Sequence, residues 1–105
     1  MIDKTNLEMN TFLLHNLDFE IKGENAFIKH YGANYVELNT KTLTAIIRLN
    51  QAYFLPKKKR ELKRLFNKEY DLINKDLKIF ESKFNVKIKV LKEVEWCLNT
   101  RNIMA

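Results

Sequence analysis

The sequence predicts an α+β fold: an antiparallel three- to four-stranded sheet packed against a short helix and one long amphipathic helix. Apolar and polar residues alternate over residues 16–39, and two glycine-containing turns interrupt this stretch. Over residues 57–84 the apolar residues instead recur at helical spacing. At 105 residues, the chain is expected to fold as a single α+β domain over 1–105.

The first half of the chain is predicted to form an antiparallel meander over about 16–39. Residues 1–15 carry no clear pattern, and we expect a short helix or an irregular lead-in through Leu7 to Leu14. Apolar and polar residues then alternate in three runs, which are 17–22, 26–31 and 35–38. The only two glycines, Gly23 and Gly32, lie between these runs, where a turn often requires a positive φ. Short turns between consecutive strands indicate antiparallel pairing.

Two helices are expected after the meander. Asn39 or Thr40 could cap a helix over about 40–55, because either side chain accepts hydrogen bonds from a first helical turn. Pro56 suits the first turn of a second helix over 57–84. Three apolar columns run along that helix: Leu65/Leu72/Ile79, Phe66/Ile73/Phe80 and Tyr70/Leu77/Phe84. They cover roughly half of its circumference, so it should pack against more than one neighbour.

The C-terminal part is predicted in less detail. Asn85 is expected to end the long helix, and alternation over about 86–91 predicts a further strand that joins the meander. Residues 92–101 fit either a strand or a short helix, and periodicity does not separate the two.

Composition indicates a cytoplasmic protein. Apolar residues make up 46% and charged residues 30%, which is typical of a globular chain. No apolar run approaches the about 20 residues that span a bilayer, and residues 1–10 lack the apolar core of a signal peptide. Cys97 is the only cysteine, so no internal disulfide can form. These features together predict a reducing compartment.

The net charge of +6 and the pI of about 9.5 favour acidic partners. A second explanation is a genome rich in A and T, which raises Lys over Arg whatever the protein does. Lys, Asn, Ile, Phe and Tyr account for 47 of the 105 residues. Such a composition also suits a phage or mobile-element protein. The placement of the charge therefore has to decide whether it is functional.

A basic helix face is the strongest functional signal. Seven of the twelve residues from 57 to 68 are Lys or Arg, and the helical projection gathers basic residues opposite the apolar columns, interrupted only by Asp71. The candidate nucleic-acid-binding residues are Lys57, Lys58, Arg60, Arg64, Lys68, Lys75 and Lys78. A stripe of one sign suits a phosphate backbone and predicts contacts without sequence preference. The competing interpretation is an ordinary solvated helix face.

The sequence argues against an enzyme, and no cofactor or metal is expected. Cys97 has apolar neighbours, and His15 and His30 lie in or near strands without metal-ligand partners at suitable spacing. A remote alternative is a magnesium-dependent nuclease using Asp18, Glu20 and Lys22. Restriction-type nuclease cores are similar in strand order, but they divide their acidic residues between two strands, whereas here all three residues fall on one.

We therefore expect a small non-enzymatic accessory protein that binds nucleic acid or another polyanion. The alternative is a protein-binding inhibitor of a host protein or nucleoprotein machine, such as an anti-defence protein. A homodimer closing the wide apolar arc of residues 62–84 is also open, although burial under the protein's own sheet is favoured. Membrane binding is not expected, because the apolar arc is needed for the core.

Overall fold

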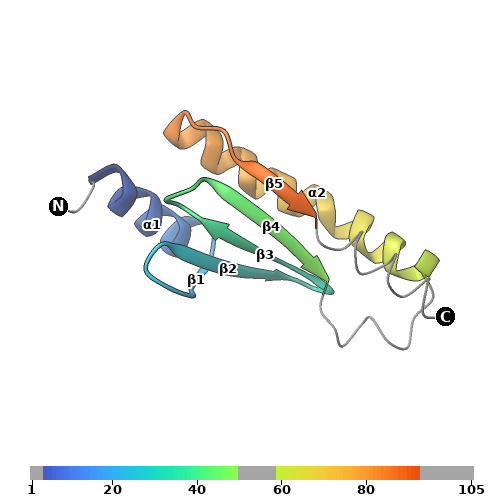
Figure 1. Ribbon diagram of the computed structural model, residues 1–105. Helices are drawn as coiled ribbons and strands as arrows, with labels where there is room; N and C mark the ends of the chain where they lie inside the picture. Colours follow the sequence, from blue (N-terminus) through green and yellow to red (C-terminus); the bar gives the residue numbers. More distant parts are fainter. Residues whose placement is uncertain (1–3, 50–58, 93–105) are drawn as a thin grey trace.

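The computed structural model describes residues 4–49 and 59–92, which form a five-stranded sheet and two helices (Figure 1). The elements in chain order are α1 (Lys4–Asn16), β1 (Glu20–Ile21), β2 (Ala26–Tyr31), β3 (Asn34–Asn39), β4 (Thr44–Leu49), α2 (Lys59–Phe84) and β5 (Lys89–Lys92). The predicted α+β class is confirmed. The sheet has five strands, one more than the upper limit expected.

The strands lie in the order β1-β2-β3-β4-β5. Strands β1 to β4 form an antiparallel meander, in which Glu37 lies between Ile28 of β2 and Ile46 of β4. Strand β5 is parallel to β4, and α2 lies between the two in the chain. Parallel neighbours require such a crossover, because a tight turn can only join antiparallel strands.

The predicted helix over 40–55 is wrong where the structure describes it, because residues 44–49 form β4. Asn39 does not cap a helix. Its Oδ1 accepts hydrogen bonds from the backbone N–H groups of Lys41 and Thr42, both at 2.9 Å, and so stabilises the turn that leads into β4. A short apolar run fits a strand as well as a helix, and pairing with β3 decides between them. Residues 50–55 lie outside the described residues.

The first predicted strand is shorter than expected. Asp18 has a φ of 56°, which breaks the extended backbone, and β1 contains only Glu20 and Ile21. Leu17 and Phe19 are nevertheless buried, as the alternation predicted, whereas Ile21 is 66% exposed. Upstream, the helix alternative for the lead-in is confirmed by α1.

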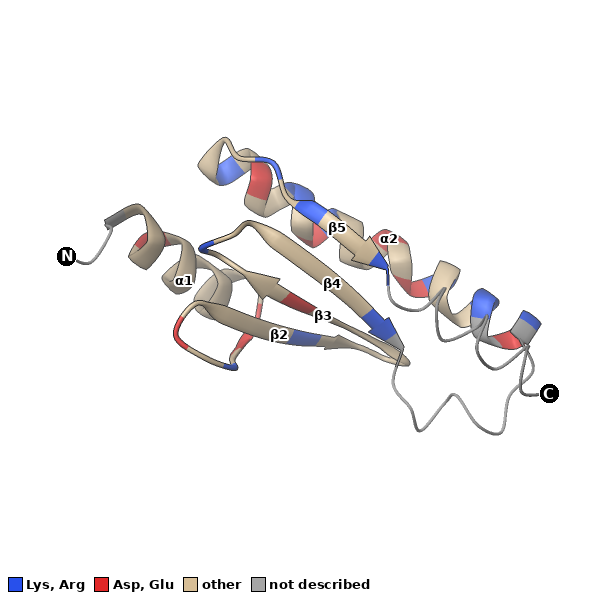
Figure 2. Ribbon diagram, viewed as in Figure 1, with Lys and Arg blue, Asp and Glu red and all other residues tan. Residues whose placement is uncertain are grey.

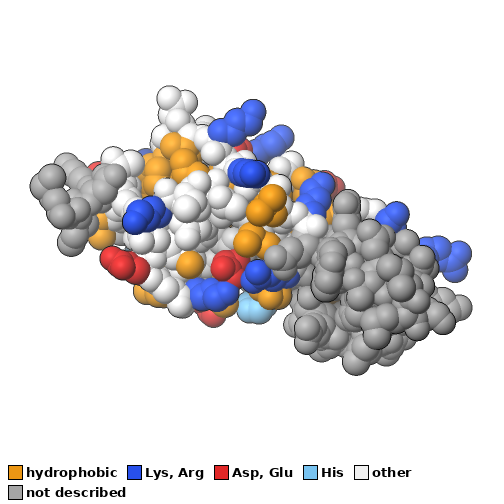
Figure 3. Space-filling view, viewed as in Figure 1, with side chains coloured by type: hydrophobic (Ala, Val, Ile, Leu, Met, Phe, Trp, Pro, Cys, Tyr) orange, Lys and Arg blue, Asp and Glu red, His pale blue; other side chains and the backbone are white. Residues whose placement is uncertain are grey.

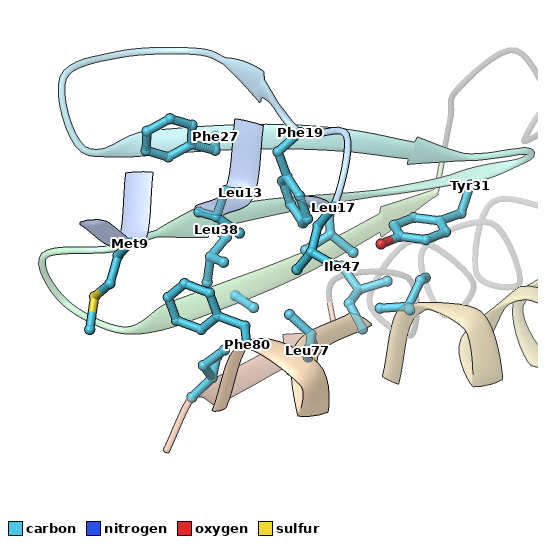
Figure 4. Close-up of a cluster of buried hydrophobic side chains, with 14 of the residues drawn as sticks. Met9, Leu13, Leu17, Phe19, Phe27, Tyr31, Leu38, Ile47, Leu77 and Phe80 are labelled. Atoms are coloured by element: carbon cyan, nitrogen blue, oxygen red, sulfur yellow. The ribbon is translucent and has the colours of Figure 1, made fainter. Parts of the chain in front are cut away.

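Both helices pack on one face of the sheet, and the core lies between them and the strands (Figure 4). The Phe12 ring of α1 lies 6.4 Å from that of Phe80 and 5.5 Å from that of Phe84, both of α2. The buried side chains of the helices are Met9, Leu13, Phe66, Ile73, Leu77 and Phe80. The strands contribute Phe27, Val36, Leu38, Ala45 and Ile47. No described helix covers the opposite face of the sheet, which we call the open face.

The long helix is confirmed, and Asn85, with a φ of 53°, follows its last residue. The predicted strand over 86–91 is found three residues later as β5, and residues 93–101 lie outside the described residues. One of the three apolar columns is not buried under the sheet. Leu72 is 57% and Ile79 40% exposed, although Phe66, Ile73 and Phe80 are in the core.

Two isoleucines of α2 offer a matched test of this packing. Ile73 is fully buried and Ile79 is 40% exposed. We expect Ile73→Val to lower the free energy of unfolding by about 0.5–1.5 kcal/mol, because it removes a buried methylene group. Ile79→Val should change it by less than about 0.5 kcal/mol. Urea denaturation of both variants in dilute solution measures the difference, and equal losses would contradict the assigned helix orientation.

Candidate nucleic-acid interface

Five of the predicted basic residues lie together on the exposed side of α2. Arg60, Arg64, Lys68, Lys75 and Lys78 are all exposed, and we call them the basic stripe. At about 100° per residue they fall within an arc of roughly 80°, centred opposite the buried Phe66, Ile73 and Phe80. Basic segments recur along α2 in Figure 2. Lys57 and Lys58 lie outside the described residues.

The basic stripe forms no ion pair with the described residues. The described residues form three ion pairs, which join Lys22 to Glu37, Arg48 to Glu37 at 2.9 Å, and Lys29 to Asp76 at 2.8 Å. All three involve a cation of the sheet or of the β1–β2 turn. Asp71 is exposed within the stripe, as the sequence indicated, and is the only acidic residue there. The stripe therefore presents a net positive surface to solvent.

The acidic residues of α2 are mostly used for internal contacts. Glu69 and Asp76 bind the sheet, and Glu81 accepts a hydrogen bond from the backbone N–H of Ile88 at 2.7 Å. Helix faces that are merely solvated usually mix both signs. Here three of the five acidic residues of α2 are turned toward the rest of the protein, which leaves the outer side basic.

The amino end of α2 also carries positive charge. Arg60 lies in the first turn, where the helix dipole disfavours a cation by about 0.3–1 kcal/mol, and Glu61 offsets part of this cost. Residues 44–49 form a strand, so the part of the predicted 40–55 helix that the structure describes is absent. A bound anion near this end would compensate the unfavourable charge.

Glu69 fixes α2 against the turn between β2 and β3. Its carboxylate accepts the backbone N–H of Ala33 at 2.9 and 3.1 Å and the Nδ2 group of Asn34 at 2.5 Å. Asn34 is fully buried, and its Oδ1 has no hydrogen-bond partner among the described residues. Gly32, with a φ of 68°, leaves room for this contact, since a Cβ there would lie 1.9 Å from Oε2 of Glu69.

Asp76 fixes α2 against β2. Its Oδ2 accepts hydrogen bonds from Nζ of Lys29 at 2.8 Å and from the hydroxyl of Tyr31 at 2.5 Å. Burial raises the pKa of Tyr31 above its usual value, and the hydrogen bond to Asp76 and the negative charge of Asp76 raise it further. Two carboxylates on one side of the helix thus set its rotation, and this rotation turns the basic stripe outward.

Tyr31 and Tyr35 flank the β2–β3 turn, and aromatic rings of this kind can stack on bases, but the two differ in their surroundings. Tyr31 is buried and bonded to Asp76, so it is not accessible to a base. Tyr35 is half-buried on the open face, and its ring lies 5.5 Å from that of His30. The basic stripe lies on the other side of the molecule, so neither tyrosine extends it.

The residues of the nuclease alternative do not share a strand face. Asp18 precedes β1 in a left-handed conformation, and Lys22 follows β1 and binds Glu37. No group of three or more His, Cys, Asp or Glu in the described residues is placed to hold a metal ion. His15 lies in the last turn of α1 and is not part of a strand, while Cys97 falls outside the described ranges.

The open face of the sheet has a different character. Cross-strand neighbours place Ile28, Glu37 and Ile46 side by side, and Tyr35 next to Arg48. Figure 3 shows this side of the molecule, where apolar side chains lie among charges of both signs. Leu91 of β5, paired with Ile46, is 41% exposed. Unlike the basic stripe, this surface mixes apolar groups with paired charges.

A comparison with models of protein families, with curated proteins and with solved structures found no match. Within residues 4–49 and 59–92, no helix combines the length and the hydrophobicity needed to cross a bilayer.

The two glycines test the contact of Glu69 with the β2–β3 turn. Gly32→Ala should lower the free energy of unfolding by at least about 1–2 kcal/mol, because it places a Cβ at positive φ and displaces the Glu69 carboxylate. A Cβ at Gly23 would meet no atom within 4 Å beyond its chain neighbours, so Gly23→Ala should be neutral or stabilising by up to about 1 kcal/mol. Urea denaturation measures both variants. Equal stability of the two would contradict this contact.

The raised pKa of Tyr31 predicts a loss of stability at alkaline pH. An unfolded tyrosine ionises at about pH 10, whereas Tyr31 in the folded protein keeps its proton at that pH. Above that pH the unfolded chain binds fewer protons than the folded protein does, so the free energy of unfolding falls as pH rises. Tyr31→Phe should lose less stability than the wild type between about pH 9 and 11. Tyr35→Phe is the control for the loss of a tyrosine hydroxyl. Identical slopes for the wild type and Tyr31→Phe would contradict the assignment.

Proposed function

We propose that this protein is a non-enzymatic, cytoplasmic accessory protein that binds nucleic acid through the basic stripe of α2. The observation that carries the proposal is the separation of charge on this helix. Glu69, Asp76 and Glu81 are held in internal contacts, while five cations project to solvent without an ion pair to the described residues.

The shape of the stripe suits a phosphate backbone. From Arg60 to Lys78 it extends about 27 Å at 1.5 Å per residue, and its cations are spaced by about one turn, except between Lys68 and Lys75, where two turns separate them. A straight row of cations neutralises successive phosphates and releases their counterions. Because these contacts reach phosphates and not base edges, binding is expected to have little sequence preference.

A protein partner is the second candidate, and the open face of the sheet favours it. Its apolar residues Ile28, Ile46 and Leu91 lie beside the charged pair of Glu37 and Arg48, and protein interfaces likewise combine apolar and polar groups. In this role the protein would inhibit a host protein or nucleoprotein machine, as a phage or mobile-element anti-defence protein would. Salt dependence separates the two functions, since an apolar interface responds weakly to salt.

Charge reversal in the basic stripe tests nucleic-acid binding. Fluorescence anisotropy with labelled duplex DNA, single-stranded DNA and duplex RNA at two salt concentrations measures the affinity. The wild type should bind in a salt-sensitive manner, and Arg60→Glu/Arg64→Glu should reduce the salt slope on duplex DNA by about 2 and weaken binding at low salt.

The matched control is Lys41→Glu/Lys89→Glu, which changes the net charge equally. Lys41 and Lys89 are exposed but lie in the β3–β4 turn and in β5, away from the stripe. This control should retain most of the affinity. Equal losses in both double variants would show only a net-charge effect, and the absence of wild-type binding at low salt would contradict the proposal and favour a protein partner.

A further inference from the structure

The apolar column of α2 that consists of Leu65, Leu72 and Ile79 is only partly covered by the described residues, because Leu65 packs against the core whereas Leu72 and Ile79 are exposed. Leu72 is 57% exposed, Ile79 is 40% exposed and Leu65 is half-buried. Single exposed apolar residues are common on protein surfaces. Three at heptad spacing on one helix form a continuous seam instead, and such seams are typical of helix–helix contacts.

Charged residues continue this seam in a regular order. Residues spaced by 4, 3, 4, 4, 3 and 4 positions lie within an arc of roughly 80° on one side of α2. They are Glu61, Leu65, Lys68, Leu72, Asp76, Ile79 and Lys83. The spacing is symmetric about Leu72, and charged residues at equal distances from it have opposite charge. The equivalent positions are Glu61 and Lys83, Leu65 and Ile79, and Lys68 and Asp76.

This pattern matches the seam of an antiparallel copy of itself. When two such helices run antiparallel and cross at Leu72, Glu61 of one meets Lys83 of the other, and Lys68 meets Asp76. In a parallel pair every charged residue would meet its own copy, which is unfavourable at each of the four positions. The charge order therefore selects a second copy of this chain and one orientation.

We infer that α2 forms a homodimer through this seam, antiparallel across a two-fold axis at Leu72. The contact is isologous, so each of the two charge pairs occurs twice. Glu61 and Lys83 are exposed and have no ion pair with described residues. Asp76 binds Lys29 and Tyr31 through Oδ2, and its side chain is 17% exposed. In the dimer its Oδ1 would accept Lys68 of the second copy.

The dimer places both basic stripes on the same side. The two-fold axis that relates antiparallel helices is normal to the plane containing them, so both sheets lie on one side of this plane and both stripes on the other. The helix axes would be about 8–10 Å apart. Arg60, Arg64, Lys75 and Lys78 lie outside the seam, and the dimer therefore presents a basic face twice as wide.

The contact is small, which limits its strength. Three apolar side chains per copy bury less than the about 800 Å² per partner of a standard interface. We therefore expect a reversible dimer whose population depends on protein concentration. Dimerisation can be measured as an increase in molecular mass without nucleic acid present. The test of the dimer is therefore independent of whether the protein binds nucleic acid.

Sedimentation equilibrium over a range of concentrations measures the association of the full chain. The wild type should shift from 12.6 kDa toward twice that mass as concentration rises. Leu72→Glu should stay monomeric, because it places two like charges at the two-fold axis, and circular dichroism should show that it folds. Leu91→Glu is the control: Leu91 is 41% exposed but belongs to β5, so this variant should dimerise like the wild type.

An exchange of charges tests the orientation. Glu61→Lys and Lys83→Glu should each raise the dissociation constant by at least about fivefold, since each turns two attractive contacts into repulsive ones. The double variant Glu61→Lys/Lys83→Glu should recover an affinity near that of the wild type. A monomer at every concentration, a dimer that survives Leu72→Glu, or a double variant that does not recover would each overturn the inference.

Discussion

The rest of the structure depends on the contact between α2 and the core face of the sheet. Phe66, Ile73, Leu77 and Phe80 all enter the core from this helix, and burial of each such side chain stabilises the fold by about 1.5–3 kcal/mol. The same helix carries the chain from β4 to the parallel strand β5. Without this contact, only α1 would cover the apolar side of the meander, and much of that side would face solvent.

Two carboxylates of α2 fix the rotation of the helix against the sheet. Hydrophobic packing alone tolerates some rotation of a helix, whereas hydrogen bonds require defined positions of donor and acceptor. Glu69 binds the backbone of the β2–β3 turn, and Asp76 binds two side chains of β2. These partners lie at different points along the sheet, so both bonds form only at one rotation of α2. That rotation exposes the basic stripe on one side and the apolar column beside it.

The proposed functions follow from this single orientation. A row of cations whose acidic neighbours are bound elsewhere attracts phosphates more strongly than a mixed surface does. The apolar column lies next to this row, so a second copy bound there would extend the basic surface without covering most of it. Binding and dimerisation would then use adjacent strips of one helix that share Lys68, and the other four cations of the basic stripe would stay accessible in the dimer.

The sequence by itself determined the α+β class, the long helix, the strands β2 and β3, and the basic stripe. These elements have strong periodicity over many residues, and a stripe opposite an apolar arc follows from helix geometry alone. Tertiary structure decided the elements whose local signal was ambiguous. The short apolar run at Ala45 to Ile47 became β4 because β3 offered backbone partners, and Asn39 then bonded to a turn and not to a helix. The exposure of Leu72, and the contacts of Glu69 and Asp76, depend on residues more than thirty positions away in the chain. No local pattern carries that information, because only folding brings these groups together.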